Sequence, residues 1–294
     1  MFKVLILAAQ NTVSDARMEF LIRDRLSWLR FLGFDLGAPT PDENRIWLFR
    51  EKLTRAGAID ALFAAFDRRL RERGYLPMGG QIVDAALVAA PKQRNTAAEK
   101  AAIKEGKSAA EIWPDQPAMV AQKDTDARWT LKKFAKGRPL PGGRPGIDIA
   151  IPSFGYKSSI AICRRDGFIR RGKVTDGARF DRRMLRDVVT SDNTASDVSA
   201  DTAYRSRPNE AWIKSIWRVS RVHRKKPRGK PMSARTARAN AARSTARARV
   251  EHVFAHQKDQ MGGKAEEGCS SAPSASRAPR RRSRSPTSPT TSTA

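Results

Sequence analysis

The hydrophobic period changes at Gly79, and this change constrains the fold more than any other feature of the chain. In residues 1–76, apolar residues recur three or four positions apart with charges between them, which is the spacing of amphipathic helices. The run 80–88 is instead rich in small and β-branched residues and is bounded by glycines and Pro91, as expected of a short strand. We therefore expect a helical segment followed by a domain that contains a sheet.

The helical segment is expected to hold three short amphipathic helices, around residues 20–32, 46–53 and 59–70. The second follows a turn that begins at Pro39, and the third ends near Gly74. Two interpretations stay open, a helix-turn-helix DNA reader and a plain helical bundle. The pattern alone favours the bundle.

After Gly79 the chain alternates between short apolar runs and polar segments. Residues 92–123 are polar and compatible with helix, and a long helix is expected over 233–260. Further strands are expected at 128–131, 148–151, 159–162, 168–174 and 197–201. Strands that precede helices indicate a mixed α/β domain. Residues 262–294 are rich in Ser, Thr, Pro and Arg without an apolar period, so we expect them to be disordered.

The charge points to a polyanionic partner. Lys and Arg outnumber Asp and Glu by 57 to 30, a formal charge of +27, and residues 202–294 alone hold 22 basic and 5 acidic residues. Such an excess repels itself in a compact fold, and binding to nucleic acid is the usual reason for it. No apolar run approaches the ~18 residues of a membrane span, and there is no long basic amphipathic helix for a membrane surface. Cys163 and Cys269 are too few for a disulfide framework or a zinc site, so we expect a cytoplasmic protein.

Three acidic residues stand out by their context. Asp84 lies inside an apolar strand, where a charge is costly unless it has a partner or a metal, and Asp201 lies where a short strand ends. Glu251 lies on the last helix, where Arg247 and Lys258 share its face. Each also has an ordinary structural explanation, namely a cap or ion pair, a turn residue, and a surface salt bridge with Arg247. Spacing alone leaves both explanations open.

Three histidines, His223, His252 and His256, are further candidates. The last two lack the adjacent Glu and the third ligand that a helical metalloprotease motif requires. We therefore expect all three at the surface or facing DNA.

Several segments together resemble one family. They are GGQIVDA (79–85), APKQRNT (90–96), QKDTDARW (122–129), ADTAYRS (200–206), and the stretches 219–231 and 247–258. The chain resembles DDE transposases of bacterial insertion sequences, in the IS-five-like group whose catalytic domain is ribonuclease-H-like. The likeness covers about residues 1–261. It implies a helical DNA-binding domain (1–76), a ribonuclease-H-like α/β catalytic domain (77–261) and a basic tail (262–294).

The resemblance assigns roles to the three acids. Asp84, Asp201 and Glu251 match the family's catalytic residues, which bind two Mg²⁺ (or Mn²⁺) ions, and carboxylate oxygens suit these hard cations. The family's late helix carries Tyr-x2-Arg-x3-Glu-x6-Lys. Arg247, Glu251 and Lys258 fit this pattern, whereas Ser244 stands at the Tyr position. Arg247 and Lys258 are then expected to position DNA phosphates.

The expected partner is double-stranded DNA, both the terminal repeats of the element and the target, bound by a homodimer in the bacterial cytoplasm near the nucleoid. No membrane partner is expected. A basic segment after residue 223 favours a phosphate clamp over a sequence reader, although a solvated charged loop is the alternative. The expected DNA contacts are Tyr204, Arg224, Lys225, Lys226, Arg228 and Lys230.

Four positions depart from the family pattern. Ser199 and Gly172 stand where Trp is expected, and Ser159 and Phe180 where His is expected. Each is expected to loosen packing around the site, since loss of a buried Trp costs about 3–5 kcal/mol.

The ends of the chain also depart from the pattern. From the resemblance, we expect the N-terminal segment to lack the opening residues of family members. After Met261 an apolar helix is expected, but the Ser/Pro/Thr-rich tail stands there. A frameshift near residues 262–263 would explain the tail, because the codons of PTSPTT (286–291) permit ANLAYN in a shifted frame.

Three hypotheses follow. The first is an active transposase, and the second is a DNA-binding remnant without catalytic activity. The third, a basic structural or RNA-binding protein, leaves the three placed carboxylates unexplained.

Overall fold

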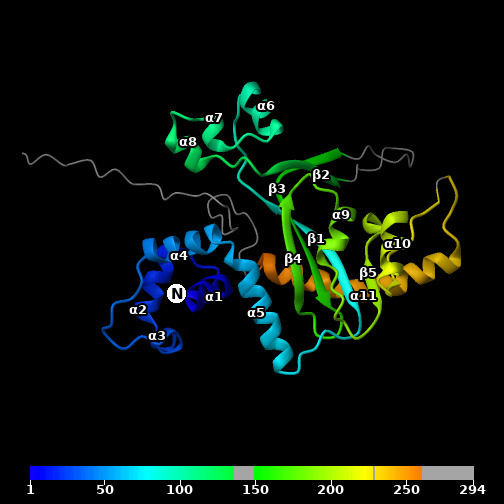
Figure 1. Cartoon of the computed structure of the whole chain (residues 1–294), viewed down its shortest axis with the longest axis horizontal. Helices are drawn as coiled ribbons and strands as arrows, with labels where there is room; N and C mark the ends of the chain where they lie inside the picture. Colours follow the sequence, from blue (N-terminus) through cyan, green and yellow to red (C-terminus); the bar gives the residue numbers. More distant parts are fainter. Residues whose placement is uncertain (136–148, 228, 260–294) are drawn as a thin grey trace, which may run out of the picture. The chain divides into compact units, whose positions relative to one another are not determined.

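The computed structural model describes residues 1–135, 149–227 and 229–259. They form two compact units, residues 1–92 with 126–259 and residues 93–125 (Figure 1). Arg228, the tail 262–294 and the proposed frameshift lie outside the described residues. None of the described helices is both long enough and apolar enough to cross a membrane.

The first unit begins with five helices rather than the three expected. They are α1 (Phe2–Asn11), α2 (Asp15–Asp24), α3 (Leu26–Leu32), α4 (Glu43–Arg55) and α5 (Ala58–Glu72). The helix expected around 20–32 is broken at Arg25, whose extended backbone ends α2 before α3 begins. Ser14 and Asp42 cap α2 and α4 by accepting a backbone hydrogen bond three residues on, which satisfies an end that has no helical partner.

The first four helices bury a small apolar core of their own. It contains Val4, Leu7, Ala8, Met18, Leu21, Ile22, Trp28, Leu29 and Ile46. The core is formed by the apolar faces of the helices, whose periodic spacing predicted them. The hydrophobic effect drives these faces out of contact with water.

The sheet has six strands. They are β1 (Gln81–Ala89), β2 (Arg128–Ala135), β3 (Ile149–Cys163), β4 (Ile169–Asp176), β5 (Asp197–Ala200) and β6 (Val219–Ser220). The order is β2-β3-β1-β5-β6, with β4 also paired to β3. β1, β3 and β4 are antiparallel neighbours, whereas β5 lies parallel to β1 and β6 parallel to β5.

The strands expected at 148–151 and 159–162 are one strand, since 149–151 and 159–162 both belong to β3, while residue 148 lies outside the described residues. Gly155 lies in its middle, where β3 crosses the end of β1. A Cβ atom there would lie 2.1 Å from the carbonyl oxygen of Val88, and the φ of 149° is a conformation that favours glycine. A single long strand is possible because this position carries no side chain.

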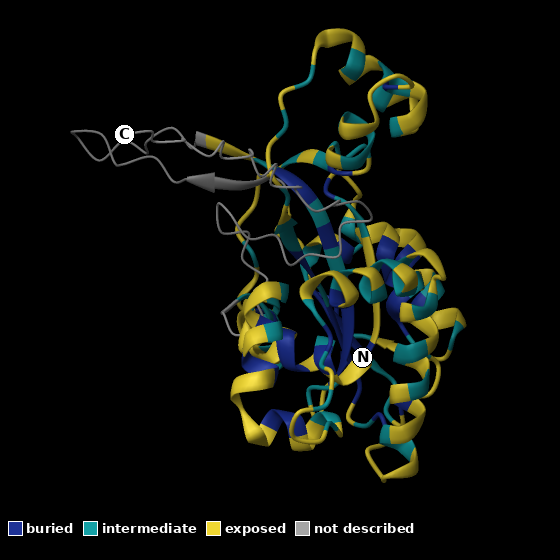
Figure 2. Cartoon of the chain, turned by 90° about the vertical axis from the view of Figure 1, so that its left-hand side faces the viewer, coloured by how far each residue is buried: buried dark blue, intermediate teal, exposed yellow. Residues whose placement is uncertain are grey.

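Helices cover both faces of the sheet (Figure 2). One face packs against α9 (Asp181–Val188) and α10 (Arg207–Ser215), and the other against α11 (Ala234–Asp259). Alternate residues of β1 serve the two faces, so Val83 lies in the first core and Ile82 in the second. The predicted mixed α/β fold with a helical N-terminus is confirmed.

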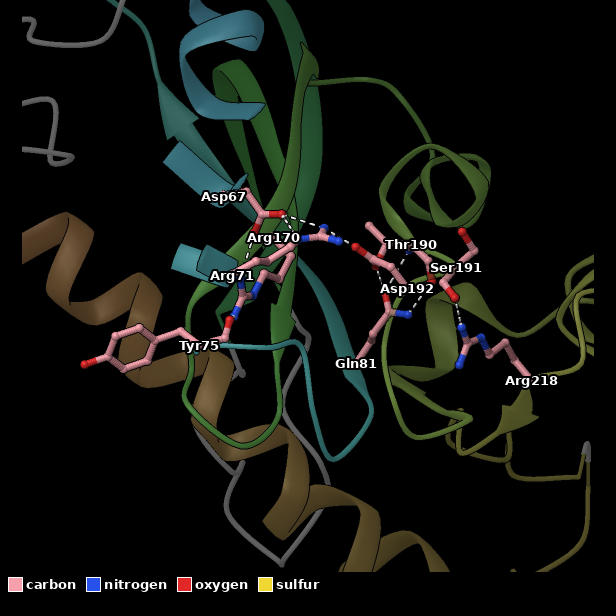
Figure 3. Close-up of polar contacts among 9 residues, drawn as sticks. All are labelled: Asp67, Arg71, Tyr75, Gln81, Arg170, Thr190, Ser191, Asp192 and Arg218. Carbon is pink, nitrogen blue, oxygen red and sulfur yellow. Dashed lines mark hydrogen bonds and ion pairs between the residues drawn. The ribbon is translucent and has the colours of Figure 1, made fainter. Parts of the chain in front are cut away.

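A buried ionic network fastens α5 to the sheet (Figure 3). The guanidinium of Arg170 on β4 donates to Asp67 at 2.8 Å and to the carbonyl of Tyr75 at 2.6 Å. Arg71 donates to Asp67 as well and forms an ion pair with Asp192. Buried charges need such partners, because desolvation otherwise costs more than their attraction returns.

The second unit contains three short helices, α6 (Ala97–Glu105), α7 (Ala109–Ile112) and α8 (Pro117–Gln122). Thr96 and Glu99 form a reciprocal capping box at the start of α6. Glu99 also accepts a hydrogen bond from the indole of Trp113 at 2.8 Å, which joins α6 to the segment after α7. The helix-permissive composition of 92–123 is thus borne out.

Candidate active site

The strand register brings Asp84 and Asp201 to neighbouring positions. β1 and β5 are parallel, with Ile82 opposite Ser199 and Val83 opposite Ala200, so Asp84 and Asp201 follow at the next step. Because side chains alternate along a strand, Asp84 points to the same face as Ile82, which is the face covered by α11. Asp201 leaves the sheet and caps a short 3-10 helix (Thr202–Tyr204), accepting from the backbone N–H of Thr202 at 2.5 Å.

Helix α11 brings Arg247 and Glu251 to Asp84. One guanidinium nitrogen of Arg247 lies 3.1 Å from a carboxylate oxygen of Asp84, and another lies 3.2 Å from one of Glu251. Val250 and Phe254 fix the register of the helix by packing in the same apolar cluster as Ile82 of β1. The side chain of Asp84 is 14% exposed and that of Glu251 58%, so the arrangement opens toward solvent on the helix side.

Tyr204 lies buried among acidic residues. Its side chain is 1% exposed, and its hydroxyl has no hydrogen-bond partner among the described residues. Burial raises the pKa of this hydroxyl, and the negative charges of Asp84, Asp181 and Asp201 raise it further. The structure differs here from the expected DNA contact, because a buried ring has no surface to offer to DNA.

His223 is also buried, contrary to the surface position expected for it. Its Nδ1 lies 3.1 Å from the carbonyl oxygen of Ala200, immediately before Asp201. Its Nε2 lies 3.0 Å from Oγ of Ser244 and 3.1 Å from the carbonyl oxygen of Asn240, both on α11. The imidazole therefore joins the end of β5 to the helix that carries Glu251. His252 and His256 are exposed, as expected.

The donor set has the right chemistry for a hard divalent cation. Asp84, Asp201 and Glu251 offer carboxylate oxygens, which Mg²⁺ and Mn²⁺ prefer. Within the described residues, however, no three acidic, His or Cys side chains already lie together as a metal group. Asp84 and Glu251 instead share the guanidinium of Arg247. Arg247 thus links Asp84 to Glu251, and the strand register places Asp201 next to Asp84.

The predicted phosphate clamp lies at the surface. Arg224, Lys225, Lys226 and Lys230 are all exposed. A hollow beside this segment is lined by Arg205, Ser206, Arg207, Glu210, Arg224 and Lys225. Lys258 is half-buried in the last turn of α11 and makes no hydrogen bond or ion pair within the described part of the chain. Arg205 and Arg207 were not singled out by the sequence, because nothing in it shows that α10 begins beside the basic segment.

The four unusual positions differ in their surroundings. Ser159 and Ser199 are buried, and the hydroxyl of Ser159 has no hydrogen-bond partner among the described residues. At Gly172 an added Cβ would meet Ile160 at an ordinary 3.6 Å. Phe180 is 61% exposed, so the expected loosening of packing does not apply to its own side chain.

Comparison with known families identifies the chain. Residues 76–270 match the family model described as a transposase DDE domain, and residues 1–52 match one described as a transposase domain. The chain belongs to the DDE transposase family. No curated protein and no solved structure gives a significant match. The predicted family is therefore confirmed, and with it a DNA transposase enzyme whose fold is ribonuclease-H-like, while the IS-five-like subgroup stays a prediction.

Proposed function

We propose that this transposase cleaves and joins DNA strands at the ends of an insertion sequence, and that Asp84, Asp201 and Glu251 hold the divalent ions that the reaction needs. The observation that carries the proposal is the meeting of Asp84 and Glu251 at Arg247, which lies 163 positions after Asp84 in the chain. A surface salt bridge or an isolated cap would explain one of these acids. Neither explains why strand and helix acids converge.

The residues divide the work by their position. Asp84 and Asp201 are fixed by neighbouring strands, whereas Glu251 reaches the site from a helix and is more exposed. Bound Mg²⁺ or Mn²⁺ supplies the activation of a water or of a 3′-hydroxyl and stabilises the leaving oxygen. Arg247, which lies between Asp84 and Glu251, contacts a DNA phosphate.

The remaining surface fits double-stranded DNA. The exposed cations Arg224, Lys225, Lys226 and Lys230 contact backbone phosphates of the terminal repeats or of the target, in a sequence-independent way. The helical segment, residues 1–76, reads the ends, and residues 77–261 carry out the chemistry. Two ends must be held together, so we propose a homodimer on DNA, acting at the nucleoid.

A cleavage assay tests the proposal. Linear DNA that carries the sequences flanking the gene of this chain is incubated with the purified protein and Mn²⁺ or Mg²⁺. We expect metal-dependent nicking at the element ends, which Asp84→Asn and Glu251→Gln abolish while DNA binding by fluorescence anisotropy persists. Asp187→Asn removes a surface acid that lies 3.4 Å from Lys173, and this control retains nicking.

Two results count against the proposal. If Asp84→Asn still nicks the DNA, the carboxylate of Asp84 is not needed for the reaction and the proposed role of the three acids is refuted. Salt-sensitive DNA binding by the unaltered protein without any nicking would instead identify a DNA-binding remnant.

A further inference from the structure

A group of basic side chains surrounds the hollow at the start of α10. Arg205 and Arg207 line it from one side, and Arg224 and Lys225 from the basic segment after β6. The only acidic residue of the lining is Glu210, and its carboxylate is already engaged. It accepts from Arg205 at 3.2 Å and from the hydroxyl of Ser220 at 2.9 Å.

Three of these cations have no ion-pair partner among the described residues. Arg207, Arg224 and Lys225 are exposed, and their side chains make no hydrogen bond or ion pair with the residues that the structure describes. Like charges held this close repel one another, which a compact fold tolerates when an anion from outside offsets them.

Arg243 on α11 lies close enough to these basic side chains to be affected by their charge. Burial lowers the pKa of its guanidinium, and the neighbouring charges of Arg224, Arg205 and Arg221 lower it further. Arg243 lies one turn of helix before Arg247, which contacts Asp84 and Glu251. A polyanion fits this group of cations better than a single small anion, because it offsets several cations at once.

His223 fixes the hollow relative to the carboxylates. It is adjacent to Arg224 and contacts Ala200, which precedes Asp201, as well as Ser244 on α11. The backbone N–H of Arg224 also donates to the side chain of Asn240 at 3.0 Å. The basic segment is thus attached to both elements that carry acids.

We infer that this hollow binds one backbone phosphate of the DNA strand that is cut, through Arg207, Arg224 and Lys225. The inference rests on the proposed function and adds a defined subsite to it. Because His223 and Asn240 tie the hollow to β5 and α11, the bound phosphate lies a fixed number of linkages from the cleaved bond. The hollow therefore sets the register of the strand in the site.

The inference is tested with the full chain and the same end-containing duplexes. The probe is a series of duplexes in which one phosphate at a time is replaced by a neutral methylphosphonate. For the unaltered protein, binding weakens at one linkage at a constant distance from the nicked bond. The double variant Arg207→Gln/Lys225→Gln binds the unmodified duplex more weakly, by roughly 5–10-fold per lost contact at 0.1 M salt. The neutral linkage then costs this variant less than it costs the unaltered protein, because only Arg224 is left to contact the phosphate.

A matched control separates this site from general charge. Lys214→Gln removes an exposed cation from the same helix, at its other end. It should keep the sensitivity to the neutral linkage. The slope of log Kobs against log salt should fall in magnitude by about 2 in the double variant.

The outcomes distinguish the two proposals. Suppose that the unaltered protein binds and nicks the duplex. If Lys214→Gln then weakens binding as much as Arg207→Gln or Lys225→Gln alone does, the subsite is refuted and the proposed function stands. Sensitivity to neutral linkages spread along the duplex refutes it too. If the folded protein neither binds nor nicks the duplex, both proposals fail.

Discussion

Replacing Arg247 by Gln is expected to raise the affinity of the protein for Mn²⁺ and to lower its affinity for DNA. The guanidinium lies 3.1 Å from Asp84 and 3.2 Å from Glu251, so it competes with any cation that needs those oxygens. Gln keeps most of the side-chain volume and removes the charge. If Arg247 had only a structural role, its replacement would not raise the affinity for Mn²⁺ while lowering the affinity for DNA.

The magnitude follows from the exposure of the two pairs. Glu251 is 58% exposed, so its pair with Arg247 is worth at most about 1 kcal/mol. Asp84 is 14% exposed, and its charge-assisted hydrogen bond is worth about 1.5–3 kcal/mol. The cation recovers only part of this sum, because Gln still hydrogen-bonds the acids. A net gain of about 1.4–2 kcal/mol corresponds to roughly 10–30-fold tighter Mn²⁺ binding.

The assay is a titration of the purified protein with Mn²⁺, followed by the electron paramagnetic resonance signal of the free ion. Arg249→Gln is the matched control, since it removes the same charge from the same helix. Arg249 instead donates to the carbonyls of Arg164 and Arg165. If both variants change the Mn²⁺ affinity equally, the effect is one of net charge, and the local competition argued for Arg247 is refuted.

Three further predictions concern stability, each measured by urea unfolding with an unchanged m-value as the check on two-state behaviour. Arg170→Met leaves the buried Asp67 with Arg71 alone and is expected to cost about 3 kcal/mol; a change below ~1 kcal/mol would contradict the role given to the network in Figure 3. Phe254→Ala removes one of the apolar contacts of α11 with the sheet and should cost about 3–5 kcal/mol, with nicking lost in parallel if the helix positions Glu251. Ser159→Ala removes a buried hydroxyl without a partner among the described residues, so stability should hold or rise by about 1 kcal/mol, and a clear loss would reveal a missed hydrogen bond.

The elements that carry Asp84 and Glu251 were expected within two residues of their observed bounds. β1 is a run of small and β-branched residues bounded by glycines and Pro91, and such a run indicates a strand. The short α9 and α10 were not predicted, since eight or nine residues with few apolar positions give little signal. β6 has only two residues and owes its place to pairing with β5, which no local pattern records.

The site was predicted from a resemblance and not from spacing. Asp84, Asp201 and Glu251 were singled out by matching motifs, whereas their proximity depends on strand order and on the packing of Phe254. The burial of His223 had no sequence signal, because two of its three partners are main-chain carbonyl oxygens, which every residue has. The sequence predicted Tyr204 as a DNA contact because a motif does not show whether the ring is buried or exposed.

Arg247 also provides a positive charge beside the carboxylates of the site before any metal binds. Carboxylates on neighbouring strand ends repel each other, and burial adds to the cost of their charge. Nearby cations offset this repulsion: Arg247 contacts Asp84 and Glu251, and Lys157 lies 3.1 Å from Asp181. We expect the guanidinium of Arg247 to exchange these carboxylates for a phosphate when DNA binds. Metal and DNA affinities should then be coupled, so that each ligand strengthens the binding of the other, and the coupling should vanish in Arg247→Gln.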